Sequence, residues 1–201
     1  MKTLCLPITV NRTWCKLAAL TAGLGLLAGC VVMSVYPYYT VKDLTFDAGL
    51  AGRWAKPGTP NEFWEFTPVA GKSYFVTTTE NSETNHFDGY LFLLKGTRFM
   101  DLCTTNRDDF RQLPLHMVLQ LNRVDNDLKL AVLDYNWLEK LLKAKPSTLR
   151  HIVVPEKPLE TNSGNMYYLT ADTRDLQKFI LKHRDNTNAF TPIGELKRVA
   201  Q

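Results

Sequence analysis

Two neighbouring stretches, Glu62-Phe-Trp-Glu-Phe-Thr67 and Ser73-Tyr-Phe-Val-Thr-Thr-Thr-Glu80, set the architecture of this chain. Both are rich in aromatic and β-branched residues, which are enriched in β-strands. Between them lies Val69-Ala-Gly-Lys72, a short segment whose glycine permits a tight reversal. The pair therefore predicts a β-hairpin, and the rest of the chain extends it in both directions.

Further strands are predicted before and after this hairpin. Short apolar stretches separated by polar or glycine-containing turns occupy residues 50–55, 86–94, 97–103, 114–123 and 128–133. In the fourth of these, Leu115, Met117, Leu119 and Leu121 share one face opposite more polar positions. One face of that strand is therefore expected to be buried, and the whole order is that of an antiparallel meander.

Two helices are predicted in the later part of the chain. Asp134 is a plausible N-cap, and apolar residues then recur at helical spacing until Pro146 ends the element. A second amphipathic helix starts at Thr170 or Asp172 and ends before Asn186. Strands are predicted between them at residues 151–154 and 166–170. The chain is therefore expected to be one α+β domain.

Gly52-Arg53-Trp54, at the first strand of the domain, resembles the Gly-Xaa-Trp motif of lipocalins. In that superfamily the tryptophan closes the base of a β-barrel and a distant arginine commonly stacks on it. The resemblance implies a mainly antiparallel curved sheet or lipocalin-like barrel with two short helices. It leaves closure of the barrel open, because the predicted helix at residues 134–145 interrupts the strand order. The arginine is not assigned among Arg150, Arg174, Arg184 and Arg198.

The N-terminal residues predict export and lipidation. Basic residues precede an uncharged apolar run at residues 17–28, too short for a spanning helix of about 20 residues. The run ends in Leu27-Ala-Gly-Cys30, which resembles the lipobox of bacterial lipoprotein precursors. That resemblance implies a signal peptide at residues 1–29, a lipidated Cys30 in a tether of residues 30–45, and a single domain at residues 46–201. Val31 stands in place of Asp after the cysteine, and by resemblance to the sorted lipoproteins of two-membrane bacteria this favours the outer membrane, facing the periplasm.

Residues 31–40 are aromatic and apolar, whereas a flexible tether is usually rich in Gly and Ser. Two interpretations remain open: the segment lies among lipid headgroups, where Tyr is favoured, or it packs as an edge strand of the domain. The net charge of +4 includes cations of the signal and gives no indication of a nucleic-acid partner. Once Cys30 carries lipid, Cys103 is the single cysteine of the mature chain, and we expect it to be a small buried side chain.

No recognised catalytic, cofactor or metal motif occurs in the sequence. The histidines His86, His116, His151 and His183 are scattered without the spacing of zinc ligands. Asp101 interrupts an apolar strand, and we expect it simply to point outward; an enzyme would need groups such as Asp101 and His116 to converge in a wet cleft. We therefore predict no enzyme activity, no cofactor and no metal.

Aromatic residues crowd the first predicted strands, and alternation would direct about half of them inward. They define a candidate apolar cavity lined by Trp54, Phe63, Trp64, Phe66, Phe75, Tyr90 and Phe92. The predicted function is a membrane-anchored envelope lipoprotein that binds a lipid or another apolar or amphipathic ligand. The alternative is a structural or assembly protein of the envelope that acts through protein contacts.

Overall fold

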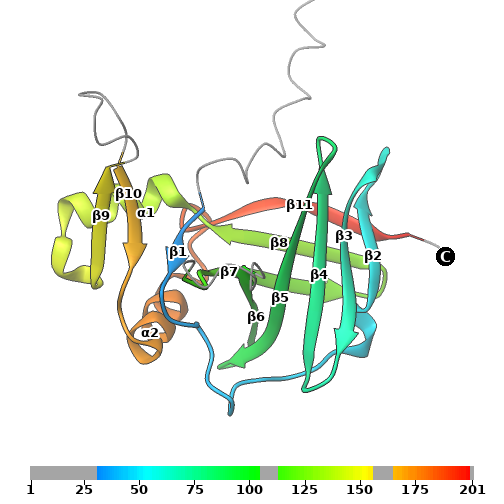
Figure 1. Cartoon of the computed structure of the whole chain (residues 1–201), viewed down its shortest axis with the longest axis horizontal. Coiled ribbons are helices and arrows are strands. Elements are labelled where there is room, and N and C mark those ends of the chain that lie inside the picture. The colour runs from blue at the N-terminus through cyan, green and yellow to red at the C-terminus, as the bar shows by residue number, and fades with distance from the viewer. Residues whose placement is uncertain (1–30, 105–112, 156–164, 200–201) are drawn as a thin grey trace, which may run out of the picture.

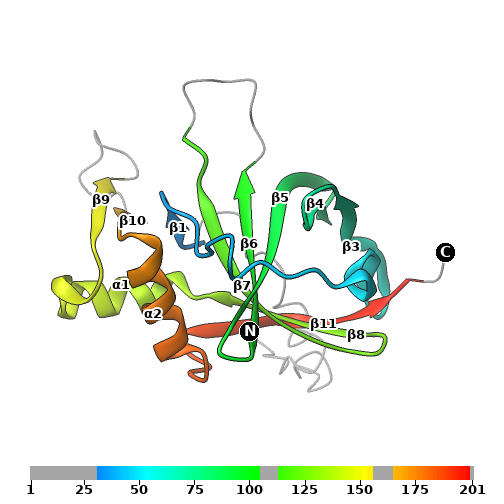
Figure 2. The ribbon, with the colours of Figure 1, turned by 90° about the horizontal axis from the view of Figure 1, so that it is seen from below.

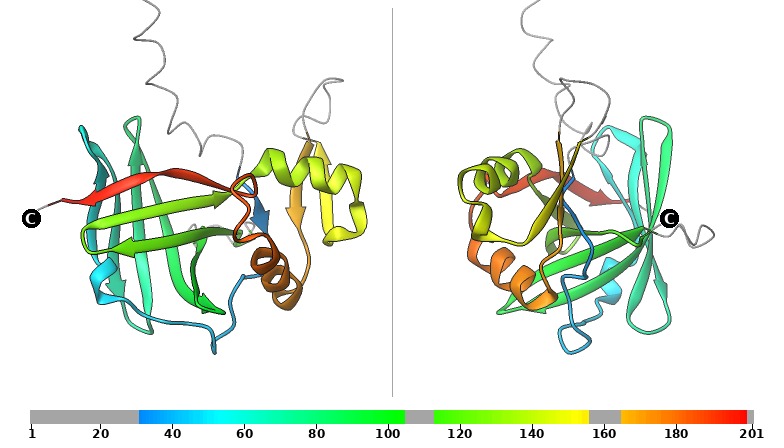
Figure 3. Two further views of the ribbon diagram at one scale, coloured as in Figure 1. Left: turned by 180° about the vertical axis from the view of Figure 1, so that it is seen from behind. Right: turned by 60° about the vertical axis from the view of Figure 1, so that its left-hand side comes forward.

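The computed structural model describes residues 31–104, 113–155 and 165–199. Within these ranges, eight antiparallel strands pair in a closed ring (Figures 1 and 3). In ring order they are β2 (Gly52–Lys56), β3 (Thr59–Val69), β4 (Ser73–Glu80), β5 (Glu83–Leu94), β6 (Thr97–Thr104), β7 (His116–Val124), β8 (Asp127–Leu133) and β11 (Phe190–Arg198). Pairing of β11 with both β8 and β2 completes the ring. The fold is therefore a closed, lipocalin-like α+β barrel.

The remaining elements extend the sheet and cover one side of the barrel (Figure 2). The short strand β1 (Met33–Ser34) pairs with β7 and with β10 (Asn165–Leu169), and β10 pairs with the edge strand β9 (His151–Pro155). The helices α1 (Tyr135–Ala144) and α2 (Thr173–His183) flank these strands, and the 3-10 turns η2 (Ala48–Leu50) and η3 (Pro146–Thr148) complete the described elements. The insertion between β8 and β11 thus forms a second layer outside the barrel.

Both predicted helices are confirmed, with aspartates at their N-caps. The Asp134 carboxylate accepts a hydrogen bond from the Trp137 amide at 2.8 Å, and Asp172 accepts one from the Asp175 amide at 3.1 Å. Each cap satisfies one of the amides that the first turn of a helix leaves unpaired. The side chains that recur at helical spacing, among them Leu138 and Leu176, are completely buried.

Two apolar cores lie on opposite faces of the barrel wall. The interior is filled by side chains from all the barrel strands: Trp54, Trp64, Phe66, Tyr74, Val76, Phe87, Leu91, Met100, Leu102, Met117, Leu119, Leu121, Leu128, Leu130 and Leu196. The outer core packs Phe92, Phe99 and Val118 of the barrel wall against Leu138 and Leu142 of α1 and Ile180 of α2. Strands β5 to β8 therefore bury both faces over part of their length, which is why their sequences are nearly continuously apolar.

The two ends of the barrel differ. The turns β3–β4, β5–β6 and β7–β8 and the start of β2 lie at one end, which η2 and Leu50 cover. Asp47 organises this closed end, because its carboxylate contacts Arg123 at 3.1 Å and its main chain exchanges two hydrogen bonds with the Tyr74 hydroxyl. The opposite end carries the β2–β3 and β4–β5 turns and the insertion after β8. We call it the open end.

The structure adds one strand that the sequence did not predict, β11, and it forms a second, β1, in a segment whose structure the sequence left open. Strand β11 closes the barrel, although Pro192 and Gly194 lie within it; a bulge between these two residues accommodates them. Strand β1 lies in the predicted tether, where Val32 and Tyr38 are buried in the outer core. Of the two interpretations of residues 31–40, packing into the domain is the one observed. The folded domain therefore includes residues before Phe46, where the sequence placed its start.

No helix in the described part of the chain is long and apolar enough to cross a bilayer. Cys30 and the predicted signal peptide lie outside the described residues.

Candidate functional site

Three of the seven predicted cavity residues face the barrel interior. Trp54 of β2 pairs with Trp64 of β3, and Phe66 follows two residues later on the same face. All three belong to the packed interior cluster, and Trp54 is completely buried. Their role at the closed end is therefore to fill the barrel.

The other four predicted cavity residues lie on the outer face of the barrel wall. Phe63 lies beneath the Arg53 guanidinium at 3.9 Å, and Phe75 is 37% exposed and stacks on His86. Tyr90 stacks on Tyr39, and Phe92 belongs to the outer core. Strand alternation explains these positions, because each of the four is an odd number of residues from an interior neighbour.

The interior becomes polar toward the open end. Thr78 pairs with Trp64 and is 2% exposed, yet its hydroxyl has no hydrogen-bond partner among the described residues. One carboxylate oxygen of Glu80, two residues further along β4, is likewise buried and unpaired. Burial, reinforced by Glu62, raises the pKa of Glu80, while Lys56 acts in the opposite direction. These groups are capable of hydrogen bonding to water or to a polar group at the open end.

Asp101 and His116 come together on the outer face of the wall. The carboxylate of Asp101 is completely buried and lies 2.7 Å from Nδ1 of His116. Its second oxygen accepts a hydrogen bond from the Tyr38 amide at 2.8 Å. Burial raises the pKa of the Asp101 carboxyl, and the two hydrogen bonds oppose that rise. Asp101 points outward, as predicted, but the N-terminal segment covers it, so the pair fixes this segment to the barrel.

Cys103 is partly buried and pairs with His116 across β6 and β7. Its thiol donates weakly to the Thr104 carbonyl at 3.8 Å. The described residues contain no group of three or more His, Cys, Asp or Glu side chains arranged to hold a metal ion. The predicted absence of a metal remains a prediction.

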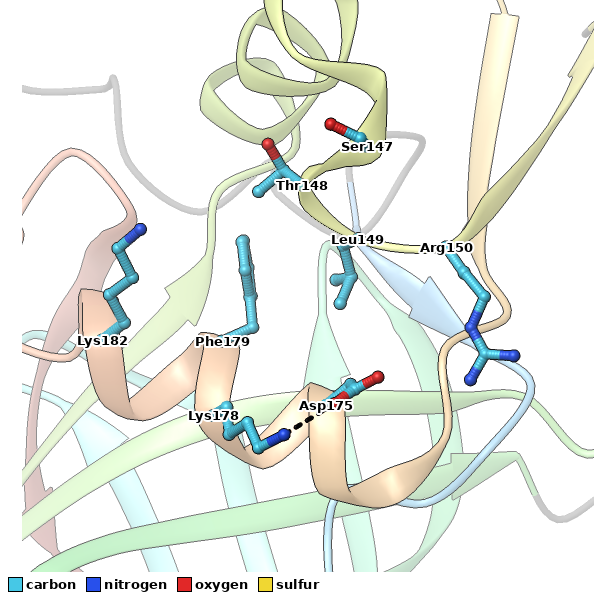
Figure 4. Close-up of a pocket in the computed structure, with 8 residues that line it drawn as sticks. All are labelled: Ser147, Thr148, Leu149, Arg150, Asp175, Lys178, Phe179 and Lys182. Atoms are coloured by element: carbon cyan, nitrogen blue, oxygen red, sulfur yellow. Dashed lines mark hydrogen bonds and ion pairs between the residues drawn. The ribbon is translucent and has the colours of Figure 1, made fainter.

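A groove lies between α2 and the segment from η3 to β9 (Figure 4). Its volume is about 330 Å³, which is at the lower end of the range for small-molecule sites. Leu149 and Phe179 form an apolar floor, and both are 5% exposed. Ser147 and Thr148 supply hydroxyls on one side. The rings of Trp137 and His183 pack against the Phe179 ring and hold it in place.

Charged side chains border this floor. Arg150, Lys178 and Lys182 provide three cations, and Asp175 provides the one acid among the described lining residues. Arg150 pairs with Asp172 at 2.9 Å and Lys178 pairs with Asp175 at 3.1 Å, whereas Lys182 makes no ion pair with any residue that the structure describes. Both pairs are exposed to solvent, where ion pairs are weak, so an anion that enters the groove is able to replace either carboxylate.

The spacing of four residues in the sequence indicates one wall of this groove, but the sequence analysis did not predict the groove. Asp175, Lys178, Phe179 and Lys182 have i, i+3, i+4 and i+7 spacing and therefore lie along one face of α2. The opposing wall at η3 lies roughly 30 residues earlier in the chain, and the tertiary fold alone brings it to the helix.

The closed barrel, its Gly-Xaa-Trp motif and an arginine stacked on the tryptophan agree with the lipocalin-like α+β fold that the sequence predicted, and this fold is compatible with a ligand-binding module. Arg198 is that arginine: its guanidinium lies over the Trp54 ring at 4.4 Å. In comparisons with known proteins, no family model matches the chain, and neither a curated protein nor a solved structure matches it at a significant level.

Proposed function

We propose that this protein is a lipid-anchored lipoprotein of the bacterial envelope that binds an amphipathic, anionic ligand. The ligand class follows from the groove between α2 and η3, which combines the apolar floor of Leu149 and Phe179 with three cations and two hydroxyls. A carboxylate or phosphate fits the border of this groove, and a short hydrocarbon segment fits its floor. The barrel serves as the rigid scaffold on which the groove is built.

Lys182 is the residue best suited to test the ligand class. It lines the groove, is exposed, and has no ion-pair partner among the described residues, so its removal disturbs little of the fold. We expect Lys182→Ala to weaken binding of decanoate about tenfold, which corresponds to about 1.4 kcal/mol for one lost charged contact. Lys140→Ala, on the exposed face of α1, is the matched control and should leave the affinity unchanged.

Decanol provides the second comparison, because it has the same chain without the charge. Calorimetric titration of the full-length protein should show binding of decanoate and at least tenfold weaker binding of decanol. Equal affinities for both compounds would show that binding depends on the apolar floor alone, and they would contradict an anion site. No binding of either compound would remove the proposed ligand class.

Anchoring is supported by the lipobox at residues 27–30, which lies outside the described part of the chain, and by the short apolar run before it. Two or three acyl chains, at about 0.8 kcal/mol per buried CH₂, give stable attachment without a spanning helix. Palmitate labelling and gel mobility should show a labelled, processed wild type and an unlabelled, uncut Cys30→Ser precursor. A mutant still cut before residue 30 would indicate an ordinary secretory signal. Density-gradient separation tests the outer-membrane location that Val31 favours.

A further inference from the structure

The first described residues are held directly against the barrel. Val31 forms an isolated bridge with Asp134, at the end of β8, and is 6% exposed. Val32 and Ser34 are almost completely buried, and the Val35 amide donates to the Leu169 carbonyl at 2.9 Å. Val31 is therefore fixed at the open end of the barrel.

The strand register places β9 at the same height as Val31. Met33 pairs with Tyr168 in the parallel β1–β10 ladder, so Val31 is level with Met166, two residues earlier. Met166 in turn pairs with Val154 of β9. Because neighbouring strands lie about 4.8 Å apart, Val154 is about 10 Å from Val31 across the sheet. Figure 1 shows β1, β10 and β9 side by side, with the β3–β4 turn at the lower edge of the barrel.

Strand β9 presents an exposed apolar edge. Ile152, Val153 and Val154 are 50%, 45% and 40% exposed, and His151–Pro155 contains no Asp, Glu, Lys or Arg. Exposed edge strands are usually protected by charges, bulges or a covering element, because they otherwise pair with other chains. In the described part of the structure, β9 ends the sheet and its outer edge pairs with no strand.

We propose that β9 lies in the headgroup region of the membrane that holds the acylated Cys30; this inference rests on the lipid anchoring proposed above. Cys30 is joined to Val31 by one peptide bond, so the anchor is attached next to the residue that lies about 10 Å from Val154 across the sheet. An anchor at that position brings the apolar edge to the bilayer surface. At interfacial depth water and headgroups satisfy the free strand amides, which the hydrocarbon core would leave unpaired.

The experiment uses full-length, acylated protein reconstituted in vesicles of phosphatidylethanolamine and phosphatidylglycerol that contain a doxyl-labelled lipid. In a Cys103→Ala background, Val153→Cys carries a bimane label; Val69→Cys, on the β3–β4 hairpin, is the matched control because Val69 is 50% exposed. We expect doxyl lipid to quench the label at position 153 several-fold more than at position 69. Val154→Cys gives a second reporter if Val153→Cys melts at a lower temperature.

Equal quenching at positions 153 and 69 in protein that still floats with the vesicles would overturn the inference and leave the anchor intact. Loss of flotation would instead reject the anchoring on which it rests. Crosslinks between position 153 of two copies, without quenching, would assign the edge to self-association and would also overturn the membrane contact.

Discussion

The guanidinium of Arg198 lies 4.4 Å above the ring of Trp54 and joins the last strand of the barrel to the first. Its nitrogens donate to the carbonyls of Ala51, at 2.7 Å, and Gly49. The Trp54 indole donates to the Leu50 carbonyl at 2.8 Å. A residue near the C-terminus thus covers the closed end of the barrel and orders the segment that enters it.

The first prediction concerns this stacked pair. Trp54→Ala should cost about 3 to 5 kcal/mol, because a fully buried tryptophan leaves a large cavity, and should lower the melting temperature by about 6 to 20 °C. Arg198→Ala should destabilise the domain by about 1 to 3 kcal/mol, and Arg198→Lys should recover only part of this, since lysine lacks the planar fork. Arg184→Ala, which removes an exposed pair with Asp185, is the control. An unchanged melt of Trp54→Ala would remove the structural role assigned to the motif.

The second prediction concerns Asp101. Asp101→Ala leaves the Tyr38 amide and the buried His116 ring without their acceptor, so we expect a loss of about 3 to 5 kcal/mol. Asp101→Asn keeps an acceptor for the amide and should be milder. Hydrogen exchange at the Tyr38 amide should be faster in Asp101→Ala and close to wild type in Asp101→Asn. Unchanged exchange in Asp101→Ala would show that the N-terminal segment is held by its apolar contacts alone.

The third prediction tests how tightly the barrel interior is packed. A Cβ added at Gly89 would lie 2.6 Å from Cγ2 of Val76 and 3.3 Å from Sδ of Met100. Gly89→Ala should therefore destabilise the domain by about 1 to 3 kcal/mol in denaturant unfolding. The double variant Gly89→Ala, Val76→Ala removes the clashing methyl and should be more stable than the sum of the single changes. If the effects of the two single changes on stability simply add, the barrel interior has enough space for the extra methyl group of Gly89→Ala.

The fourth prediction is a pH dependence from His183. Burial, together with the nearby Lys182, lowers the pKa of its imidazole below 6.5, and Nε2 is buried without a partner in the described residues. The folded state therefore prefers neutral His183. The free energy of unfolding should fall as the pH decreases from about 6.5 to the lowered pKa of His183 in the folded state. Below that pKa, protonation of His183 should cause no further loss.

Melting curves of wild type and His183→Phe between pH 8 and pH 5 measure this effect. The difference in stability between the two proteins should change with pH in favour of the variant on the acid side, because phenylalanine keeps the ring contacts with Trp137 and Phe179 without a protonation cost. The other histidines are common to both proteins and cancel in the difference. If the stabilities of the two proteins change in parallel with pH, His183 is not the source of the pH dependence.

Local patterns in the sequence predicted most of the elements of this fold. The predicted hairpin, the meander through residue 133, both helices and the Asp134 cap of the first helix are confirmed. These features depend on alternation, turn residues and capping, all of which involve residues close together in the chain. For the same reason the sequence identified Trp54 without identifying its partner, because Arg198 reaches it only after the whole ring of strands has formed.

The lipid anchoring implied by residues 27–30, and the lack of enzyme activity inferred from the absence of a recognised catalytic motif, rest on the sequence alone and remain predictions. Only the tertiary structure decided that the barrel closes, because β11 contains a proline and a glycine that weaken its strand pattern, and its pairing partners β8 and β2 supply the missing stability. It also joined Asp101 to His116 and η3 to α2, contacts that depend on strand register and helix docking rather than on neighbouring residues.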